Sequence, residues 1–306
     1  MKTNLFFIFL TILFFNTISS KERLTIFHAG SLAVPIKQMN AGFNKIYPDV
    51  EILTEAAGSR ACVRKITDLG KKADLLFSAD YTVIKDLMFP KFADFSINFA
   101  SNEIGIMYFP HSKYSSIIDS TNWYKILLKK DVKFGHSDPN ADPAGYRSQL
   151  VWQLAEKFYN QLELYSKLKN GNPVIRPKET DLLALLESSI IDYIFIYKSV
   201  ALQHKGNFVT LDDQINLRSS KYSKFYSTAS IKLTGKKPGE WIEKKGAPIV
   251  YGFTIPKTAI NKPLALKYAQ FVLSNRGREI MEENGQTTIF PPTYSGDKTK
   301  IPSLLK

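Results

Sequence analysis

The sequence contains only one cysteine, Cys62, in 306 residues. A single cysteine excludes an internal disulfide, and the surrounding SRACVRKI supplies no metal-ligand spacing, so we expect a buried, inert thiol. The four histidines, His28, His111, His136 and His204, are scattered along the chain and do not indicate a zinc site. Long apolar runs are absent after the first twenty residues, which excludes a polytopic membrane protein.

Acidic side chains are the minority, with 28 Asp and Glu against 41 Lys and Arg and a formal net charge of +13. Lys2 is the only basic residue among the first twenty, so the remainder of the chain still carries +12. This excess of basic residues favours an anionic partner: a small oxyanion, a nucleic acid or a membrane surface. The basic residues are spread without an interleaved aromatic motif, so we predict no nucleic-acid site.

The first twenty residues, MKTNLFFIFLTILFFNTISS, join one lysine, an apolar run from Leu5 to Phe15 and small polar residues. This pattern is typical of a secretory signal peptide, and the apolar run is too short to span a bilayer comfortably. The alternative is an uncleaved anchor. No cysteine lies near the expected cleavage site at Ser19–Ser20, which excludes a lipid-modified N-terminus. We predict a signal peptide at 1–20 and an exported, soluble protein.

Three strand–turn–helix units follow: RLTIFHAGSL, VEILTEAAGSRACVRKITDLG and ADLLFSADYTVIKDLM. In the first, a strand at 24–27 leads through Ala29–Gly30 to a helix that we expect to begin at Ser31 as N-cap, with apolar residues at helical spacing. Repeated units of this kind predict a parallel sheet, in which binding sites collect at the carboxyl ends of strands.

A second α/β series begins at DVKFGHSDP and continues through a helix at 145–159 and an apolar strand at 193–197. Candidate strands at 102–110 and 247–256 cross between the two series, and the helices PLALKYAQFVLS and RGREIMEEN close the chain. A chain of this length can form two cores. We predict an α/β protein with two lobes, each a mostly parallel sheet flanked by helices: lobe I at 21–106 and 251–306, and lobe II at 107–250.

Ser31 and Ser59 occupy equivalent positions, each after a glycine and at the start of a helix that follows a parallel strand. The free amides of a helix N-terminus can bind an anion, and a serine there can also be a helix cap alone. Asp142 and Pro143 form an ordinary cap pair as well, so Asp142 either caps the next helix or faces a ligand. His28 lies three residues before Ser31, but a nucleophile-elbow pattern is absent and the sequence predicts no enzyme.

Seven segments in this order resemble the archaeal-type tungstate/molybdate-binding proteins of ABC importers: FHAGSL, AAGSR, ADLLFSADY, SDPNADPAGYRS, RPKETDLLALLES, DYIFIYKSVALQH and VYGFTIP. The resemblance runs from about Leu24 to Pro291. It implies a type II periplasmic binding protein, monomeric and without a cofactor, that closes two lobes over one small oxyanion. It also implies a membrane permease and an ATPase as partners, and a periplasmic location.

The resemblance also implies which residues bind the oxyanion. Gly30, Ser31 and Ser59 correspond to the first-lobe ligands, and Asp142, with Pro143 and Ala144 in the same turn, to the carboxylate that reaches the metal. Ile196 stands where the archaeal pattern has a second carboxylate, so it would offer only its backbone N–H, and six-coordinate binding is in question. Gln214 falls where a further ligand-side residue is expected. A binding protein for another oxyanion, such as sulfate, and a degenerate, non-binding interaction protein of the same fold are the alternatives.

Overall fold

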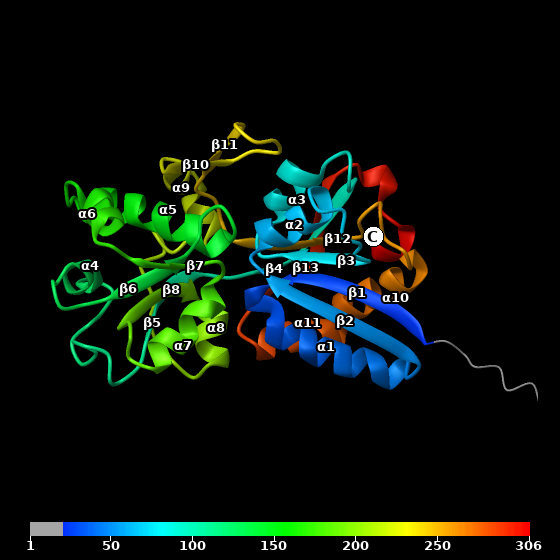
Figure 1. Cartoon of the computed structure of the whole chain (residues 1–306), viewed down its shortest axis with the longest axis horizontal. Helices are drawn as coiled ribbons and strands as arrows, with labels where there is room; N and C mark the ends of the chain where they lie inside the picture. The colour runs from blue at the N-terminus through cyan, green and yellow to red at the C-terminus, as the bar shows by residue number, and fades with distance from the viewer. Residues whose placement is uncertain (1–20) are drawn as a thin grey trace, which may run out of the picture.

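The computed structural model describes residues 21–306 as two lobes side by side, each built on its own β-sheet (Figure 1). The predicted signal peptide at 1–20 lies outside the described residues. Within 21–306, none of the helices combines the length and apolarity needed to cross a bilayer. The predicted α/β class, with a helix-flanked sheet in each lobe, is confirmed.

The first lobe contains a six-stranded sheet in the order β13-β4-β12-β3-β1-β2. Its strands are β1 (Glu22–Ala29), β2 (Val50–Ala57), β3 (Leu75–Ser78), β4 (Phe95–Ser101), β12 (Val250–Thr254) and β13 (Thr287–Gly296). Its helical segments are η1 (Gly30–Leu32), α1 (Ala33–Ile46), α2 (Ser59–Thr67), α3 (Tyr81–Met88), α10 (Lys262–Leu273), α11 (Asn275–Glu283), η4 (Lys298–Lys300) and η5 (Ser303–Leu305). Helices α1, α10 and α11 cover one face and α2 and α3 the other (Figure 1).

The second lobe contains a five-stranded sheet in the order β7-β6-β8-β5-β9 and a separate hairpin, β10-β11. The strands are β5 (Ile104–Tyr108), β6 (Phe134–Ser137), β7 (Val174–Arg176), β8 (Tyr193–Tyr197), β9 (Asn207–Val209), β10 (Ser230–Thr234) and β11 (Trp241–Lys245). The helical segments are α4 (Trp123–Leu127), α5 (Pro143–Phe158), α6 (Leu164–Asn170), η2 (Glu179–Leu182), α7 (Leu183–Glu187), α8 (Lys198–Gln203), η3 (Ser220–Tyr222) and α9 (Ser223–Tyr226).

The three predicted strand–turn–helix units form the parallel part of the first sheet, because each helix returns the chain to the same edge. Both sheets also contain strands that run against this direction, so each sheet is mixed. In the first lobe, β12 runs antiparallel to β3 and β4, and β13 runs antiparallel to β4. In the second, β5 runs antiparallel to β8 and β9. Strands β5 and β12 each follow a crossing and enter their sheet from the other lobe, which reverses their direction.

The chain passes between the sheets twice. It leaves the first sheet after β4 and enters the second at β5, so the first crossing is at Asn102–Glu103 rather than after residue 106 as expected. It returns through residues 246–249 into β12. Both crossings lie beside the faces that the lobes turn to each other, and the candidate site is assembled at these faces.

Candidate functional site

Ser31 lies in η1, just after β1, where the first lobe meets the second. The predicted role of Ser31 as a helix cap is wrong, because α1 begins at Ala33 and the Ser31 side chain makes no capping bond. Its Oγ instead accepts a hydrogen bond of 3.0 Å from the Tyr251 hydroxyl, which in turn accepts one of 3.1 Å from Asn102 Nδ2. A serine hydroxyl has one proton, and that proton of Ser31 has no acceptor within residues 21–306.

Ser59 is the first residue of α2, after the N-cap Gly58, and its hydroxyl does not cap the helix either. The side chain is fully buried, and its Oγ accepts a hydrogen bond of 2.9 Å from the backbone N–H of Ala79. Like Ser31, Ser59 therefore has an occupied acceptor position and a proton that remains available to a ligand.

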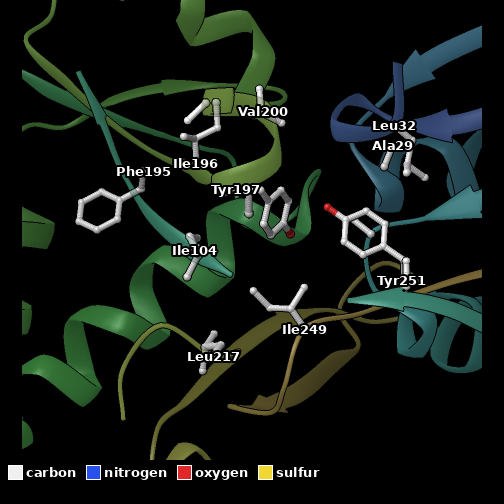
Figure 2. Packing of buried hydrophobic residues seen from close by; sticks show 14 of the residues in the cluster. Ala29, Leu32, Ile104, Phe195, Ile196, Tyr197, Val200, Leu217, Ile249 and Tyr251 are labelled. Carbon is white, nitrogen blue, oxygen red and sulfur yellow. The ribbon is translucent and has the colours of Figure 1, made fainter. Parts of the chain in front are cut away.

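Tyr197 places a third hydroxyl in the same region, from the end of β8 in the second lobe. Figure 2 shows it opposite Tyr251 of the first lobe, and the two ring centroids are 5.9 Å apart. Its Oη accepts a hydrogen bond of 2.6 Å from Arg147 Nη1. Burial raises the pKa of the Tyr197 hydroxyl well above its usual value, so the hydroxyl keeps its proton and can donate it.

Asp142 both caps α5 and contacts a second segment. Its Oδ1 accepts from the backbone N–H of Ala144 at 3.2 Å, as the predicted cap requires, and Oδ2 accepts from the backbone N–H of Glu179 at 2.9 Å. Asp142 is 1% exposed. A buried carboxylate with two backbone donors is a fixed group, and it lies against the first lobe, since a Cβ built on Gly58 would be 2.9 Å from Asp142 Cβ.

Glu179, which begins η2, is the carboxyl group that the sequence analysis missed. It is 1% exposed, and within residues 21–306 neither of its side-chain oxygens has a hydrogen-bond partner. A Cβ built on Gly30 of the first lobe would lie 3.6 Å from Glu179 Oε1, so this side chain faces the η1 turn. Burial, together with the Asp142 carboxylate, raises the pKa of Glu179 well above its usual value, which favours the protonated form of Glu179.

Two of the candidate residues lie away from these groups. The Ile196 side chain is buried and points toward Val200, while its neighbour Tyr197 points into the space between the lobes (Figure 2). Gln214 is half-buried in the loop after β9, at the sheet edge opposite β7, and its backbone N–H donates to Asp212 Oδ1 at 2.8 Å. The predicted ligand roles, of Ile196 through its backbone N–H and of Gln214, stay predictions.

Backbone contacts hold the two lobes closed over these groups. The backbone N–H of Ala61 in the first lobe donates to the carbonyl of Ala141 in the second at 3.1 Å. A Cβ built on Gly58 would lie 2.3 Å from the same carbonyl oxygen. The lobes approach each other this closely only because residue 58 is glycine.

A buried ionic cluster joins the lobes beside the site. Asp80 of the first lobe accepts from the Tyr146 hydroxyl at 2.5 Å and lies 2.7 Å from Lys244 Nζ and 3.5 Å from Arg147 Nη2. Burial acts against the ionised carboxylate, but the two cations outweigh it and lower the pKa of Asp80 far below its usual value. Two cations around one carboxylate leave the cluster with one net positive charge next to the candidate site.

This arrangement of hydroxyl groups suits a ligand that accepts hydrogen bonds and donates none. Three hydroxyls, from Ser31, Ser59 and Tyr197, each accept a hydrogen bond from the protein, and none of their protons has an acceptor among residues 21–306. They come from both lobes. An oxyanion satisfies such donors, whereas a cation or an apolar solute leaves them unpaired in a buried site. Within residues 21–306, His, Cys, Asp and Glu side chains form no group of three or more that could hold a metal ion.

The comparisons with known proteins agree with this fold. The family described as bacterial extracellular solute-binding protein matches residues 24–287. The chain belongs to this family. It is 54% identical over 296 residues to a solute-binding protein of Petrotoga mobilis, with 95% of this chain and 91% of that protein covered. It is also 44% identical over 313 residues to the molybdate/tungstate-binding protein WtpA of Pyrococcus abyssi, with 93% and 89% covered.

Among solved structures, the periplasmic molybdate-binding protein of Azotobacter vinelandii superposes with a TM-score of 0.63 at 14% identity, covering 88% of this chain and 99% of that one. At this identity the likeness shows a shared fold. Together with the two relatives it confirms the predicted resemblance, and proteins of the extracellular solute-binding family bind solutes rather than transform them.

The sequence could have indicated two of the missed residues. Tyr197 ends one apolar strand and Tyr251 lies within another. The hydroxyl of a buried tyrosine needs a hydrogen-bond partner, so these two residues could have been expected to take part in a polar site. Glu179 carried no such signal, because it lies in the polar run RPKETD, where an exposed side chain is the ordinary expectation.

Proposed function

We propose that this protein is an exported solute-binding protein that captures molybdate or tungstate between its lobes and delivers it to an ABC importer. The observation that carries the proposal is the set of three buried hydroxyls, Ser31, Ser59 and Tyr197, whose acceptor positions are occupied and whose protons are free. The name of the Pyrococcus abyssi relative supports this solute. A permease and an ATPase are its partners, and we assign it no catalytic activity and no cofactor.

The carboxyl groups favour a metal oxyanion over sulfate. The Asp142 carboxylate would repel a bound dianion, unless the ligand has a centre that accepts a further oxygen donor. Tungsten and molybdenum can accept such a donor, and the sulfur of sulfate cannot. Glu179, in its protonated form, adds no second negative charge in the absence of ligand. Position 196, which carries a carboxylate in the archaeal pattern, is isoleucine here, and we propose that Glu179 supplies the second carboxyl group instead.

Thermal unfolding with four anions tests this function. A ligand that binds only the folded state stabilises it by about 2.7 kcal/mol at a hundredfold excess over the dissociation constant. We expect molybdate and tungstate to raise the melting temperature clearly, and sulfate and phosphate to raise it less. The double variant Ser31→Ala/Ser59→Ala should remain folded and lose most of the shift.

Three results would contradict the proposal in different ways. A larger shift with sulfate than with molybdate would identify a sulfate-binding protein. The absence of a shift with any of the four anions would favour an interaction protein that has kept only the fold. An undiminished molybdate shift in the double serine variant would mean that the anion binds elsewhere.

A further inference from the structure

Arg147 links the site hydroxyl of the second lobe to the first lobe, although it is not itself one of the proposed anion ligands. It lies on α5 in the second lobe, and its Nη1 donates to Tyr197 Oη at 2.6 Å and to the carbonyl of Ala79 in the first lobe at 2.8 Å. The N–H of the same Ala79 donates to Ser59 Oγ at 2.9 Å. One guanidinium therefore contacts a site hydroxyl of one lobe and the residue that orients a site hydroxyl of the other.

The Arg147 side chain is well fixed in this position. Arg147 is 3% exposed, its Nη2 lies 3.5 Å from Asp80 Oδ2, and its guanidinium lies 5.7 Å from the ring centroid of Tyr197. A planar guanidinium with several donors can make these contacts at once, whereas the single ammonium of lysine cannot.

The direction of the hydrogen bond to Tyr197 determines what that hydroxyl can do. Arginine only donates, so Tyr197 Oη must accept from it, and the tyrosine proton is then directed to another acceptor. Without Arg147 the hydroxyl could rotate and use its proton within the protein. The contacts of Arg147 with Ala79 and Asp80 form only when the lobes are closed, because those residues belong to the first lobe.

We propose that Arg147 is a positioning residue that couples closure of the lobes to anion binding. On closure it docks on Ala79 and Asp80 of the first lobe and holds the Tyr197 hydroxyl as a donor to the bound anion. This inference rests on the proposed function, since it concerns the same site. It assigns to Arg147 an effect on the lifetime of the closed complex that acts through the Tyr197 hydroxyl, which an ion pair between the lobes alone would not have.

A double-mutant cycle with molybdate tests the coupling. Calorimetry would give the dissociation constants of the wild type, Tyr197→Phe, Arg147→Lys and the double variant. We expect each single change to weaken binding about 10- to 100-fold, as for a hydrogen bond to a charged group. Because Arg147 acts through Tyr197, the double variant should lose little more than the weaker-binding single variant. Stopped-flow measurements should place the Arg147→Lys loss mainly in a faster dissociation rate.

Arg147→Lys is chosen because it leaves a cation beside the buried Asp80, and its melting temperature without ligand checks that it folds. If it does not fold, Tyr146→Phe, which loosens Asp80 and leaves Arg147 intact, should raise the dissociation rate by the same mechanism. Arg23→Lys is the matched control, since Arg23 is an exposed partner of Glu51 and lies six residues, or about 20 Å, along β1 from Ala29.

The outcomes separate this inference from the proposed function. The role of Arg147 would be overturned, without affecting the proposed function, by either of two results. One is an affinity loss in the double variant equal to the product of the two single losses; the other is an Arg147→Lys variant with unchanged affinity and dissociation rate. Failure of the wild type to bind molybdate or tungstate would overturn the proposed function and this inference together. An effect of Arg23→Lys equal to that of Arg147→Lys would reduce Arg147 to a contribution of overall charge.

Discussion

Asp142 uses both carboxylate oxygens on backbone N–H groups, one from its own helix and one from η2. From the sequence, replacement by asparagine should cost little stability if Asp142 were only a cap, because asparagine caps helices about as well. The contact with Glu179 changes that expectation. The single side-chain oxygen of asparagine can accept from the N–H of Ala144 or from that of Glu179, but not from both. The amide NH2 group then faces the remaining N–H, and two donors cannot form a hydrogen bond.

We therefore expect Asp142→Asn to lower the free energy of unfolding without ligand by about 1–3 kcal/mol, the cost of one unpaired buried N–H group. It should also weaken molybdate binding markedly, because the carboxylate donor to the metal is lost. X-ray absorption at the metal edge should find more than four oxygens around molybdenum in the wild type and fewer in the variant.

Asp119→Asn is the matched control for this change. Asp119 is an exposed residue of the second lobe whose carboxylate also accepts two backbone N–H groups, from Thr121 and Asn122. It should alter stability less and leave molybdate affinity unchanged. Four oxygens in the wild type, with unaltered affinity in Asp142→Asn, would return Asp142 to the role of a helix cap.

At the level of single residues, sequence patterns predicted which turns form the site, but not which side chains in them face it. Strand–turn–helix patterns predicted where Ser31, Ser59 and Asp142 lie, because parallel strands bring those turns to one edge. They could not distinguish Ile196 from Tyr197. Adjacent residues of a strand point to opposite faces, so a change of one position moves a side chain out of the cleft.

The β10-β11 hairpin is the element that extends furthest from its own lobe toward the other (Figure 1). Arg64 on α2 of the first lobe donates to Thr234 Oγ1 at 3.1 Å and to the carbonyl of Gly235 at 2.8 Å. Lys236 in the connecting loop donates to the carbonyl of Phe89 at 2.7 Å. The hairpin was not predicted, because its lysine-rich strands show too little apolar alternation to mark a buried face.

Arg64→Gln should weaken the hold of this hairpin on α2. We expect amide hydrogens of residues 230–245 to exchange faster in the closed complex and molybdate affinity to fall about threefold, the effect of losing modest hydrogen bonds at a partly exposed site. The rest of the second lobe should exchange as in the wild type, since its sheet does not depend on the hairpin.

Arg276→Gln provides the comparison for Arg64→Gln, because Arg276 also makes exposed ion pairs, with Glu279 and Glu283, but on α11. It should leave both the exchange of the hairpin and the affinity unchanged. Unchanged exchange of residues 230–245 in Arg64→Gln would show that the hairpin does not need α2 to stay in place.

Closure of the whole molecule includes a very close backbone approach at Gly58. Its φ of −59° and ψ of 143° are accessible to alanine, so the residue is glycine for lack of space and not for backbone conformation. An added Cβ would lie 2.3 Å from the Ala141 carbonyl oxygen and 2.9 Å from Asp142 Cβ, both in the other lobe. The clash exists only when the lobes are closed.

Gly58→Ala should therefore separate folding from binding. In the open, ligand-free protein we expect unchanged or slightly greater stability, by about 0.4–1 kcal/mol, because alanine restricts the unfolded chain. Molybdate affinity should fall on the order of a hundredfold, the usual cost of overpacking a tight contact. Small-angle X-ray scattering with saturating molybdate should show a larger radius of gyration than for the wild type.

Gly171→Ala serves as the control for Gly58→Ala, since Gly171 is exposed at the end of α6 and has a φ of −73°. Wild-type affinity in Gly58→Ala, with the same scattering profile as the liganded wild type, would mean that the closed arrangement described above is not the one that binds the anion.

The order of strands in the first sheet also fixes when that lobe can be completed during synthesis. Strand β12, at residues 250–254, lies between β3 and β4, so β4 has no link to β1, β2 and β3 until four-fifths of the chain exists. The second lobe, from β5 to β11, is continuous and needs no later residues for its sheet. A ribosome-bound chain would thus carry a first lobe that cannot complete its sheet. If the predicted signal peptide directs export, that delay keeps the leading third of the chain from folding while it is translocated.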